Sequence, residues 1–359
     1  MIVAFDITQS IYGTGVSAYI TNLIAAFDKL KPPHTHFKFF AFSKGKFSQL
    51  KYLQHKYQSN PHFSFHLFPL PEKTRHLSLK LKLDPSFLIG SYDILHTPDW
   101  IGYHSSKPTI ATIHDLAIHH HPQTFPTTII SHQTRYLNWA TSKAYHLICV
   151  SKTTQSDLYH FYPNTKYKTI VIYEANPFEF DSPANWDQVA HNYQISSSQK
   201  YFITIATLEP RKNLDRLIQA FIQANLPNYH LFIAGKIGWG RVKKVHHPQI
   251  KFLGYVPSSQ LITLLQHSQG LLYVPLWEGF GLPIAAAIDY NLPILTSNQG
   301  ATAEIAPNSA ILVNPYNVPD ITQGITKLTQ LPKPYYKLPF SWLKTARLTL
   351  QLYHHILKS

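Results

Sequence analysis

A glycine-containing turn late in the sequence has residues that can hold an anion beside a group rich in hydroxyls. Glu278 stands in this turn, and an apolar helix is expected to begin near Leu282. Pro283 lies in the first turn of that helix, where a backbone N–H would have no partner within the helix. The free N–H groups and the positive dipole end of a helix N-terminus attract anions. The carboxylate repels an anion and accepts hydrogen bonds from hydroxyls instead. A diphosphate and a polyol held side by side describe a nucleotide-sugar.

A pair of adjacent cations, Arg211 and Lys212, stands at a second expected strand-to-helix turn. Arginine offers a planar fork and lysine a point charge, so both reach one anion if the turn splays their side chains. The alternative is a pair of exposed cations on a surface turn. The two turns are far apart in sequence, so the fold must bring them together before they form one site.

Both turns resemble motifs of one family. EGFGLP, from Glu278 to Pro283, resembles the donor-site motif of the family 4 retaining glycosyltransferases. TLEPRKN, from Thr207 to Asn213, is similar to the phosphate-binding turn of that family, and its threonine form resembles the branch rich in mannosyltransferases. The resemblance covers nearly the whole chain and is looser between residues 30 and 90, where acceptors are usually recognised. It implies the α/β GT-B fold, with two Rossmann-like domains facing across a cleft.

The resemblance also implies roles for individual residues. Members of this family have no obvious enzymic nucleophile, and the donor's own phosphate oxygen helps to deprotonate the acceptor. Arg211 and Lys212 would stabilise the departing diphosphate, Glu278 would hold hydroxyls of the transferred sugar, and His114 would face that sugar from a strand end. The implied donor-binding residues are Gly15, Thr207, Gly235, Tyr255, Val256, Gly279, Phe280, Gly281 and Leu282.

Several of these positions have a plainer interpretation. Gly15 follows a first strand at Ile2 to Phe5, and many α/β turns contain glycine for steric reasons. His114 is one of 22 histidines and could be a hydrogen-bonded loop residue. The segment at Tyr255 and Val256 could be an ordinary β-to-α turn.

Position 286 departs from the family pattern. The motif has a second glutamate there, which would contact the donor ribose, whereas this sequence has Ala286. Losing such a contact weakens donor binding by about 1.5–3 kcal/mol. Asp289 lies one helical turn further on and could partly substitute. We therefore predict weaker donor affinity rather than none, and tighter nucleotide binding in an Ala286→Glu variant.

Apolar strands alternate with amphipathic helices through most of the chain, which is typical of parallel α/β architecture. The segment after Tyr173 loses this periodicity and contains Pro177, Pro183 and a serine run, as linkers do. This pattern predicts two domains, residues 1–175 and 200–338, joined by a linker at 176–199. The resemblance implies that the first domain binds the acceptor and the second binds the donor, and that a C-terminal helix at 339–359 packs back toward the first domain.

The charge is strongly positive, at +14, and concentrates early in the sequence. Between Lys29 and Lys82, eleven Lys and Arg residues accompany one acid, Glu72, and many aromatics such as those of FKFFAF at Phe37 to Phe42. This basic segment, residues 29–82, suits an anionic membrane surface or a solvated surface around ordinary strands. Nucleic acid is the least favoured partner, because no recognised nucleic-acid module is present.

The remaining features exclude several classes of protein. The single cysteine, Cys149, excludes an intramolecular disulfide. No signal peptide and no apolar run of about 20 residues is visible, so we expect a cytoplasmic protein that could sit peripherally on the inner membrane face. The run His119 to His121 does not suit a metal, because consecutive side chains point in different directions. No acidic DxD-type cluster is visible either, so we expect neither a metal nor a cofactor.

Three functions remain open. The favoured one is a metal-independent retaining glycosyltransferase that moves a hexose, mannose from GDP-mannose being preferred to a UDP-hexose, onto a glycan or lipid-linked acceptor in polysaccharide biosynthesis. The second is a catalytically idle relative that binds a nucleotide, a glycan or a partner enzyme, for which Ala286 is the main support. The third is another GT-B enzyme such as an epimerase or phosphorylase.

Overall fold

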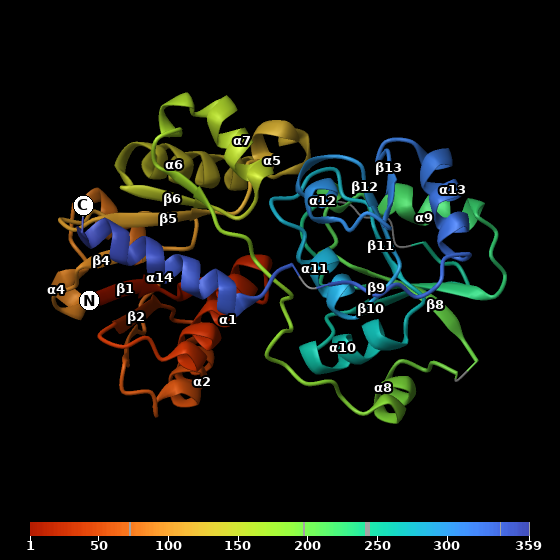
Figure 1. Cartoon of the computed structure of the whole chain (residues 1–359), viewed down its shortest axis with the longest axis horizontal. Coiled ribbons are helices and arrows are strands. Elements are labelled where there is room, and N and C mark those ends of the chain that lie inside the picture. Colours follow the sequence, from red (N-terminus) through yellow and green to blue (C-terminus); the bar gives the residue numbers. More distant parts are fainter. Residues whose placement is uncertain (72, 197, 241–244, 338, 359) are drawn as a thin grey trace. The chain divides into compact units, whose positions relative to one another are not determined.

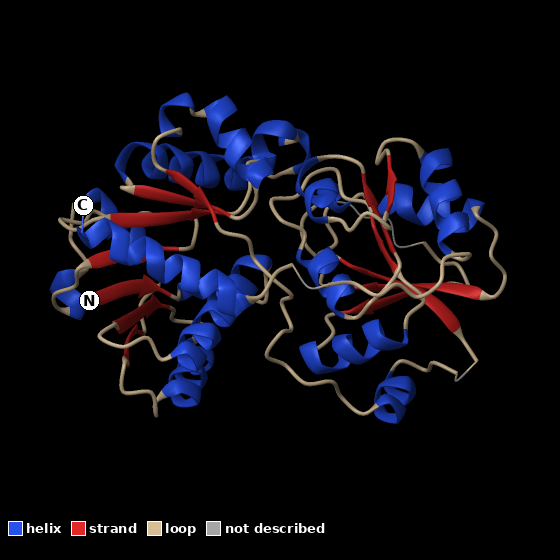
Figure 2. Cartoon of the chain, in the orientation of Figure 1, coloured by secondary structure: helices blue, strands red, loops and turns tan. Residues whose placement is uncertain are grey.

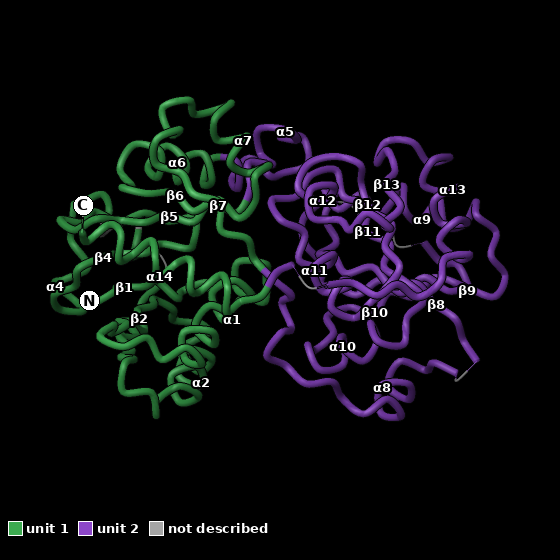
Figure 3. Tube along the Cα trace, in the orientation of Figure 1, with its two compact units in different colours: residues 1–114, 131–174, 341–359 green, residues 115–130, 175–340 purple. Residues whose placement is uncertain are grey.

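The computed structural model describes residues 1–71, 73–196, 198–240, 245–337 and 339–358 (Figure 1). Parallel strands stand at the centre of each half of the chain and helices surround them (Figure 2). The chain divides into two compact units (Figure 3). Unit 1 contains residues 1–114, 131–174 and 341–359, and unit 2 contains residues 115–130 and 175–340.

Unit 1 is built on a seven-stranded parallel sheet with the order β3-β2-β1-β4-β5-β6-β7. Its central strands are apolar runs because helices cover both faces of a parallel sheet, and all five residues of β5 are buried. The aromatics of FKFFAF belong to β2, and its four phenylalanines are buried in the core. The strands are β1 (Ile2–Asp6), β2 (His36–Phe42), β3 (Phe63–Phe68), β4 (Ile94–Thr97), β5 (Thr109–Ile113), β6 (His146–Cys149) and β7 (Thr169–Val171).

Hydrogen bonds position two helices of unit 1, α1 and α14. Helix α1 begins at Gly15 because Thr14 is its N-cap and its side chain accepts from the N–H of Ser17. The C-terminal helix α14 packs against α1, and the hydroxyl of Thr345 donates to the carbonyl of Tyr173 at 2.6 Å. The helices are η1 (Thr8–Ile11), α1 (Gly15–Leu30), α2 (Phe47–Tyr57), α3 (Lys73–Lys80), α4 (Ser86–Ile89), most of α6 (Thr127–Lys143), α7 (Lys152–Phe161), η3 (Pro163–Thr165) and α14 (Trp342–Lys358).

Unit 2 is built on a six-stranded parallel sheet with the order β10-β9-β8-β11-β12-β13. Its strands are β8 (Lys200–Ile205), β9 (Tyr229–Ala234), β10 (Ile250–Gly254), β11 (Leu271–Tyr273), β12 (Ile294–Ser297) and β13 (Ile311–Val313). Its helices are α5 (Ala117–His120), η2 (Pro122–Thr124), α8 (Trp186–Asn192), η4 (Pro210–Lys212), α9 (Leu214–Gln223), α10 (Ser258–His267), α11 (Leu282–Asp289), α12 (Gly300–Ile305) and α13 (Val318–Leu328).

The two sheets share one strand order, in which the first strand lies between the second and the fourth. This is the doubly wound Rossmann-like order, and it confirms the predicted α/β fold class. In such sheets the loops that leave the first and fourth strands diverge at the carboxyl edge and form a binding crevice. The strands concerned are β1 and β4 in unit 1, and β8 and β11 in unit 2.

The units differ in detail from the domains predicted above. Residues 115–130 lie within the expected N-terminal domain but pack as part of unit 2. The expected linker, residues 176–199, contains helix α8 and also belongs to unit 2. Across the described residues, no helix combines the length and the apolar character needed to cross a bilayer.

Candidate functional site

The two sequence motifs meet at the strand-order reversal of unit 2. Helix η4, after β8, carries the two expected cations, and the loop after β11 carries Glu278. Asn213 holds the first loop in place: it has a left-handed backbone with φ of 59°, and its Nδ2 donates to the carbonyls of Val274 and Pro315 at 3.0 and 2.7 Å. The N–H of Leu276 donates to the carbonyl of Arg211 at 2.9 Å, which ties the two loops together.

Glu278 is the centre of this cluster. Its Oε1 accepts from Nη1 of Arg211 at 3.0 Å, from the hydroxyl of Tyr273 at 2.8 Å, and from Nζ of Lys212. The same Nζ donates to the hydroxyl of Tyr273 at 3.1 Å. Both cations therefore point toward the turn that contains Glu278.

Two more groups fix the guanidinium of Arg211. Nη1 donates to the carbonyl of Trp277 at 2.7 Å, and Nη2 donates to Oε1 of Glu209 at 2.9 Å. Arg211 and Glu209 are both buried. The sequence interpretation missed Glu209 as a partner of the cations, although it directly precedes Pro210 and Arg211 in the motif.

The ionisation of the cluster follows from its geometry. Burial on its own raises the pKa of Glu278, but the charges of Arg211 and Lys212 and the hydrogen bonds from Lys212 and Tyr273 outweigh it and hold the pKa at about 2. Burial lowers the pKa of Arg211, yet Glu278 and Glu209 keep it above its ordinary value. Two acids, Glu209 and Glu278, thus pair with two cations, Arg211 and Lys212.

Helix α11 begins directly after the cluster. Gly281 precedes the helix with φ of 107°, a left-handed backbone that glycine adopts without strain. Leu282 is the first helical residue, with Pro283 in the first turn. The ring of Phe280 is buried and packs edge-on against Phe340 at 5.4 Å between centroids, so this side chain belongs to the core. The turn thus combines a carboxylate, Gly279 and a helix N-terminus.

Residues 115–130 cover part of the same cluster within unit 2. The ring of His120 stacks on Trp277 at 3.8 Å between centroids, one residue before Glu278. The guanidinium of Arg211 lies 5.8 Å from the centroid of the Phe125 ring. Nε1 of Trp239 donates to the carbonyl of Thr124 at 2.8 Å. No motif in the sequence indicated this arrangement.

The other expected donor-binding residues of unit 2 lie at the carboxyl ends of β8, β9 and β10. A Cβ at Gly235 would lie 1.8 Å from the carbonyl oxygen of Ala206, so only glycine fits where these loops approach. A Cβ at Gly238 would lie 2.6 Å from the methyl of Thr207, which places Thr207 beside the loop after β9. The side chain of Tyr255 is exposed and that of Val256 is buried.

Position 286, where the sequence departs from the family motif, lies in the interior of the protein. Ala286 lies on the buried side of α11 with 0% exposure. The carboxylate of Asp289, which the sequence suggested as a substitute, accepts from Nδ2 of Asn176 at 2.8 Å. Burial raises the pKa of Asp289, and the bond from Asn176 opposes that effect. Asp289 therefore has a partner in the segment that leads into α8.

The remaining expected residues, His114 and Gly15, belong to unit 1. His114 follows β5; its Nε2 lies 2.9 Å from the carbonyl oxygen of Pro98, and its Nδ1 lies 3.2 Å from Oε1 of Glu174. Each ring nitrogen of His114 thus faces an oxygen atom. Its ring also packs edge-on against Tyr19 of α1, at 5.1 Å between centroids. Glu174 was not among the residues singled out in the sequence.

The strand-order reversal of unit 1 contains an ion cluster of its own. Nη1 of Arg75 donates to Asp6 at 3.0 Å and to Asp99 at 2.8 Å, and the hydroxyl of Tyr103 donates to Asp6 at 2.7 Å. All four residues are buried. Burial raises the pKa of Asp99, and the charge of Arg75 opposes that rise. Arg75 comes from α3, so a side chain of the chain itself occupies the crevice between the ends of β1 and β4.

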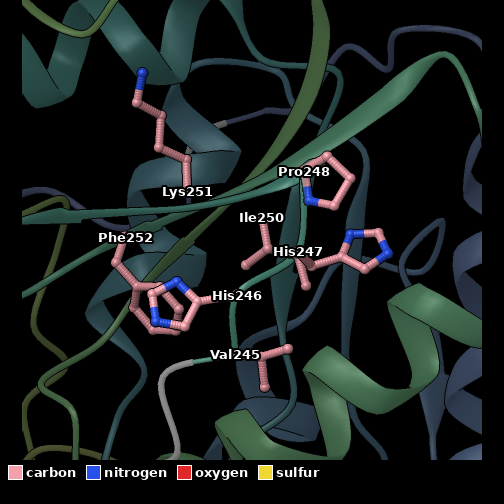
Figure 4. A pocket seen from close by; sticks show the side chains of 7 residues that line it. All are labelled: Val245, His246, His247, Pro248, Ile250, Lys251 and Phe252. Carbon is pink, nitrogen blue, oxygen red and sulfur yellow. The ribbon is translucent and has the colours of Figure 1, made fainter.

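A separate pocket lies beside β10, and its lining includes the side chains of His246, Lys251 and Phe252 (Figure 4). Nζ of Lys251 donates to the carbonyl of Tyr193. None of the expected site residues lines this pocket, so we do not assign the candidate site to it. Within the described ranges, no three His, Cys, Asp or Glu side chains are arranged to hold a metal ion.

Two family models match this chain. The model of Glycosyltransferase Family 4 matches residues 13–175, and that of Glycosyl transferases group 1 matches residues 188–347. O-antigen chain mannosyltransferase B of Escherichia coli is 27% identical over 249 residues, which cover 66% of this chain and 65% of that protein. O-antigen chain mannosyltransferase RfbU of Salmonella typhimurium is 25% identical over 62% of this chain and 61% of that protein. The alignments thus span less than two thirds of both relatives.

The solved structures agree on the fold. Anabaena Alr3699/HepE in complex with UDP and glucose superposes over 100% of both chains, with a TM-score of 0.71 and 15% identity. A likeness at this identity shows the shared fold. Because the two family matches together account for most of the sequence, the chain belongs to the glycosyltransferases, with a family 4 domain followed by a group 1 domain in the GT-B fold.

Proposed function

We propose that this protein is a retaining hexosyltransferase that moves mannose from GDP-mannose, in preference to a UDP-hexose, onto a glycan or lipid-linked acceptor in polysaccharide biosynthesis. The observation that carries the proposal is the cluster of Arg211, Lys212 and Glu278 beside the N-terminus of α11. The names of the O-antigen mannosyltransferases support mannose, and the UDP and glucose in the HepE complex support a nucleotide-sugar donor.

Spare hydrogen-bond donors in the cluster support the binding of a diphosphate. Lys212 has three N–H groups, of which two are used by Glu278 and Tyr273. The guanidinium of Arg211 has five, and three are used within the described part of the chain. One N–H on Nη2 of Arg211 and one on Lys212 are therefore left at the positive end of α11, while Nε of Arg211 is buried. They would stabilise the negative charge that develops on the leaving diphosphate.

The carboxylate of Glu278 is suited to hold the sugar. All of its hydrogen bonds from described residues go to Oε1, so this oxygen fixes the carboxylate and Oε2 is left to accept from hydroxyls of the hexose. Because the pKa of Glu278 is held at about 2, the carboxylate stays ionised at neutral pH and remains an acceptor. A fixed acceptor restricts the orientation of the sugar, which is a large part of catalysis in group transfer.

The chemistry proposed here needs no metal ion, because the two cations and the helix N-terminus supply the positive potential at the leaving group. His114 would contact the transferred sugar. The basic segment would bring the enzyme to an anionic membrane surface, where a lipid-linked acceptor is found.

A donor screen tests the proposal. The purified chain is incubated with GDP-mannose and with several UDP-hexoses, and release of the nucleoside diphosphate is measured with and without a mannan oligosaccharide acceptor. We expect GDP release from GDP-mannose, unaffected by EDTA, and an α-anomeric product by proton NMR. Lys212→Met should lower this release about 100-fold or more, and Lys327→Met, which removes an exposed lysine of α13, should leave it unchanged.

The catalytically idle alternative makes the opposite prediction. It is favoured by the buried alanine at position 286, which cannot contact a ribose. It predicts that the folded protein binds GDP or UDP in calorimetry but releases no nucleoside diphosphate from any donor. That result would overturn the proposed transferase activity.

A further inference from the structure

The surface of unit 1 contains a short basic and apolar stretch that the proposed chemistry does not use. Four large apolar side chains between β3 and β4 are exposed: Leu81 by 57%, Leu83 by 44%, Phe87 by 80% and Leu88 by 52%. Two exposed lysines alternate with the first of them, Lys80 and Lys82. We call these six residues the α4 patch. Helix α4 lies at the same end of unit 1 as the N- and C-terminal ends of the chain (Figure 1).

The element that carries this patch is anchored at its beginning. Oδ1 of Asp84 accepts from the N–H of Ser86 and the hydroxyl of Tyr92 at 2.8 and 2.7 Å. Its Oδ2 accepts from the N–H and the hydroxyl of Ser106 at 2.8 and 3.0 Å. These bonds keep the pKa of Asp84 below its ordinary value, although burial alone would raise it. The single acid in this stretch is thus engaged by hydrogen bonds rather than paired with the lysines.

The end of α4 is anchored as well. Ile89 is buried in a core cluster with Phe42 and Tyr92. Nζ of Lys38 donates to the carbonyls of Ile89 and Ser91, both at 2.9 Å, and so satisfies groups that the end of a helix leaves without partners. The backbone is therefore fixed on both sides of Phe87 and Leu88. The exposed side chains of Phe87 and Leu88 thus belong to an ordered element, and contiguous apolar patches of this kind mark interaction sites.

We propose that the α4 patch is a membrane-docking element that inserts Phe87 and Leu88 between the headgroups of an anionic bilayer while Lys80 and Lys82 bind lipid phosphates. Among the described residues, neither lysine has a carboxylate partner, so both charges are available to anionic headgroups. Apolar side chains flanked by lysines are typical of segments that lie in the interface of a membrane. The inference rests on the proposed function in one respect, because a lipid-linked acceptor would lie at a membrane surface.

Further side chains suited to a membrane interface lie along the amino edge of the sheet of unit 1. In a parallel sheet, every loop that enters a strand lies at the amino edge, and α4 leads into β4. The loops that enter β5, β6 and β7 expose Lys107, Tyr145 and Tyr167 in turn. Tyrosine is enriched at membrane interfaces because its ring is apolar and its hydroxyl is polar. The edge thus continues the patch across neighbouring strands.

Other occupants fit less well. Two copies of the patch facing each other across a twofold axis would bring lysines against lysines. A stable protein partner buries about 800 Å² on each side, whereas the patch offers a few side chains on one four-residue helix and the loop before it. The earlier expectation of a membrane surface rested on the whole basic segment, but the phenylalanines of β2 are buried and cannot take part. The α4 patch places the contact at residues 80–88, which overlap the basic segment at residues 80–82.

Co-sedimentation with vesicles tests the proposal, without nucleotide or acceptor. The full chain is mixed with vesicles of phosphatidylcholine, or of equal parts phosphatidylcholine and phosphatidylglycerol. We expect binding to the mixed vesicles that falls as salt rises. Phe87→Ser/Leu88→Ser should lower the partition constant about tenfold, and Lys80→Gln/Lys82→Gln about thirtyfold at low salt.

Two variants of matched chemistry serve as controls. Tyr335→Ser removes an exposed aromatic of unit 2, and Lys327→Gln/Lys333→Gln removes the same net charge from exposed positions of unit 2. Both should bind like the wild type. The proposal is overturned if the wild type ignores the mixed vesicles, if the controls lose as much binding as the patch variants, or if the patch variants instead abolish a concentration-dependent dimer. Because no sugar transfer is measured, failure of the proposed activity would not affect this result.

Discussion

Nη1 of Arg211 donates to Oε1 of Glu278 at 3.0 Å, so the residue expected to bind phosphate and the residue expected to bind sugar are partners in the same ion pair. Lys212 shares that oxygen. The two functions therefore depend on each other: a change at Glu278 alters the charge offered to the diphosphate as well as the hold on the hexose. With Glu209 included, the cluster pairs two acids with two cations.

Glu278→Gln should separate these functions. The amide preserves the shape of the side chain but leaves the cluster with one positive charge, so we expect transfer to fall about 100-fold while GDP binds several-fold tighter by calorimetry. Glu209→Gln adds the same charge without touching the sugar and is the matched control, which should retain transfer. Weaker binding of GDP to Glu278→Gln would show that Glu278 contacts the nucleotide directly.

Replacing Glu174 should test whether the orientation of His114 matters. Glu174→Leu removes the acceptor at Nδ1, and we expect kcat to fall about tenfold, as for other residues that orient a functional histidine, with the KM for the donor unchanged. Glu174→Gln retains an acceptor oxygen and should keep most of the activity. An unaltered kcat in the leucine variant would leave Glu174 with a structural role only.

Removing Arg75 should destabilise unit 1 strongly. Arg75→Met leaves two buried carboxylates, those of Asp6 and Asp99, without their counterion, and we expect the free energy of unfolding to fall by about 3–5 kcal/mol. Urea unfolding measures this change. Arg135→Met, at an exposed position on α6, should alter stability by less than about 0.5 kcal/mol. Adding Asp99→Asn to the Arg75 variant should restore part of the loss.

A buried hydrogen bond links the last helix to the sheet. Nδ1 of His96 on β4 lies 2.6 Å from the hydroxyl of Tyr353 on α14, and Nε2 lies 2.8 Å from the hydroxyl of Thr112. Tyr353→Phe leaves one buried ring nitrogen without its partner, which should lower the free energy of unfolding by about 1–3 kcal/mol. The exposed Tyr52→Phe on α2 is the control. Equal denaturant midpoints for the two variants would contradict the prediction.

His96 should also make stability depend on pH. Burial, followed by the charge of His114, lowers the pKa of His96 from 6.5 to about 3. The unfolded chain therefore binds a proton between these values that the folded chain does not bind, and stability should fall as pH decreases through this window, by up to about 1.4 kcal/mol per pH unit. Urea unfolding between pH 6.5 and 4.5, which lies within this window, measures the effect. The free energy of unfolding of His96→Gln should depend less steeply on pH than that of the wild type. An identical slope in both proteins would contradict this assignment.

The convergence of Arg211, Lys212 and Glu278 was predictable because it depends on local features. Each turn follows a strand with a clear apolar pattern, and the doubly wound order places the ends of β8 and β11 side by side. The left-handed glycine at position 281 and the proline after it mark the start of α11 in the sequence itself. The fold class follows from the same alternation of strands and helices.

Pairings across the fold were not predictable in the same way. Glu209 reads as a solvated acid before a proline, and only the tertiary structure shows that it neutralises Arg211. Arg75 lies in a segment with no clear periodicity, yet its guanidinium fills the crevice between β1 and β4. The sequence suggested that the aromatics of β2 could lie on a surface, because lysine and histidine stand among them. In the structure, neighbouring elements bury most of this strand. The role of His114 stays a prediction.

The route of the chain through its two units limits how the enzyme can be divided. Residues 115–130 pack as part of unit 2, where His120 stacks on Trp277. The block at residues 175–340 is therefore not a complete module by itself. Expressed alone, that block would expose Trp277, lose the ring beside Arg211 and leave Nε1 of Trp239 without its carbonyl. Swapping donor domains between enzymes of this type would therefore succeed only if the sixteen-residue excursion is exchanged together with the block it covers.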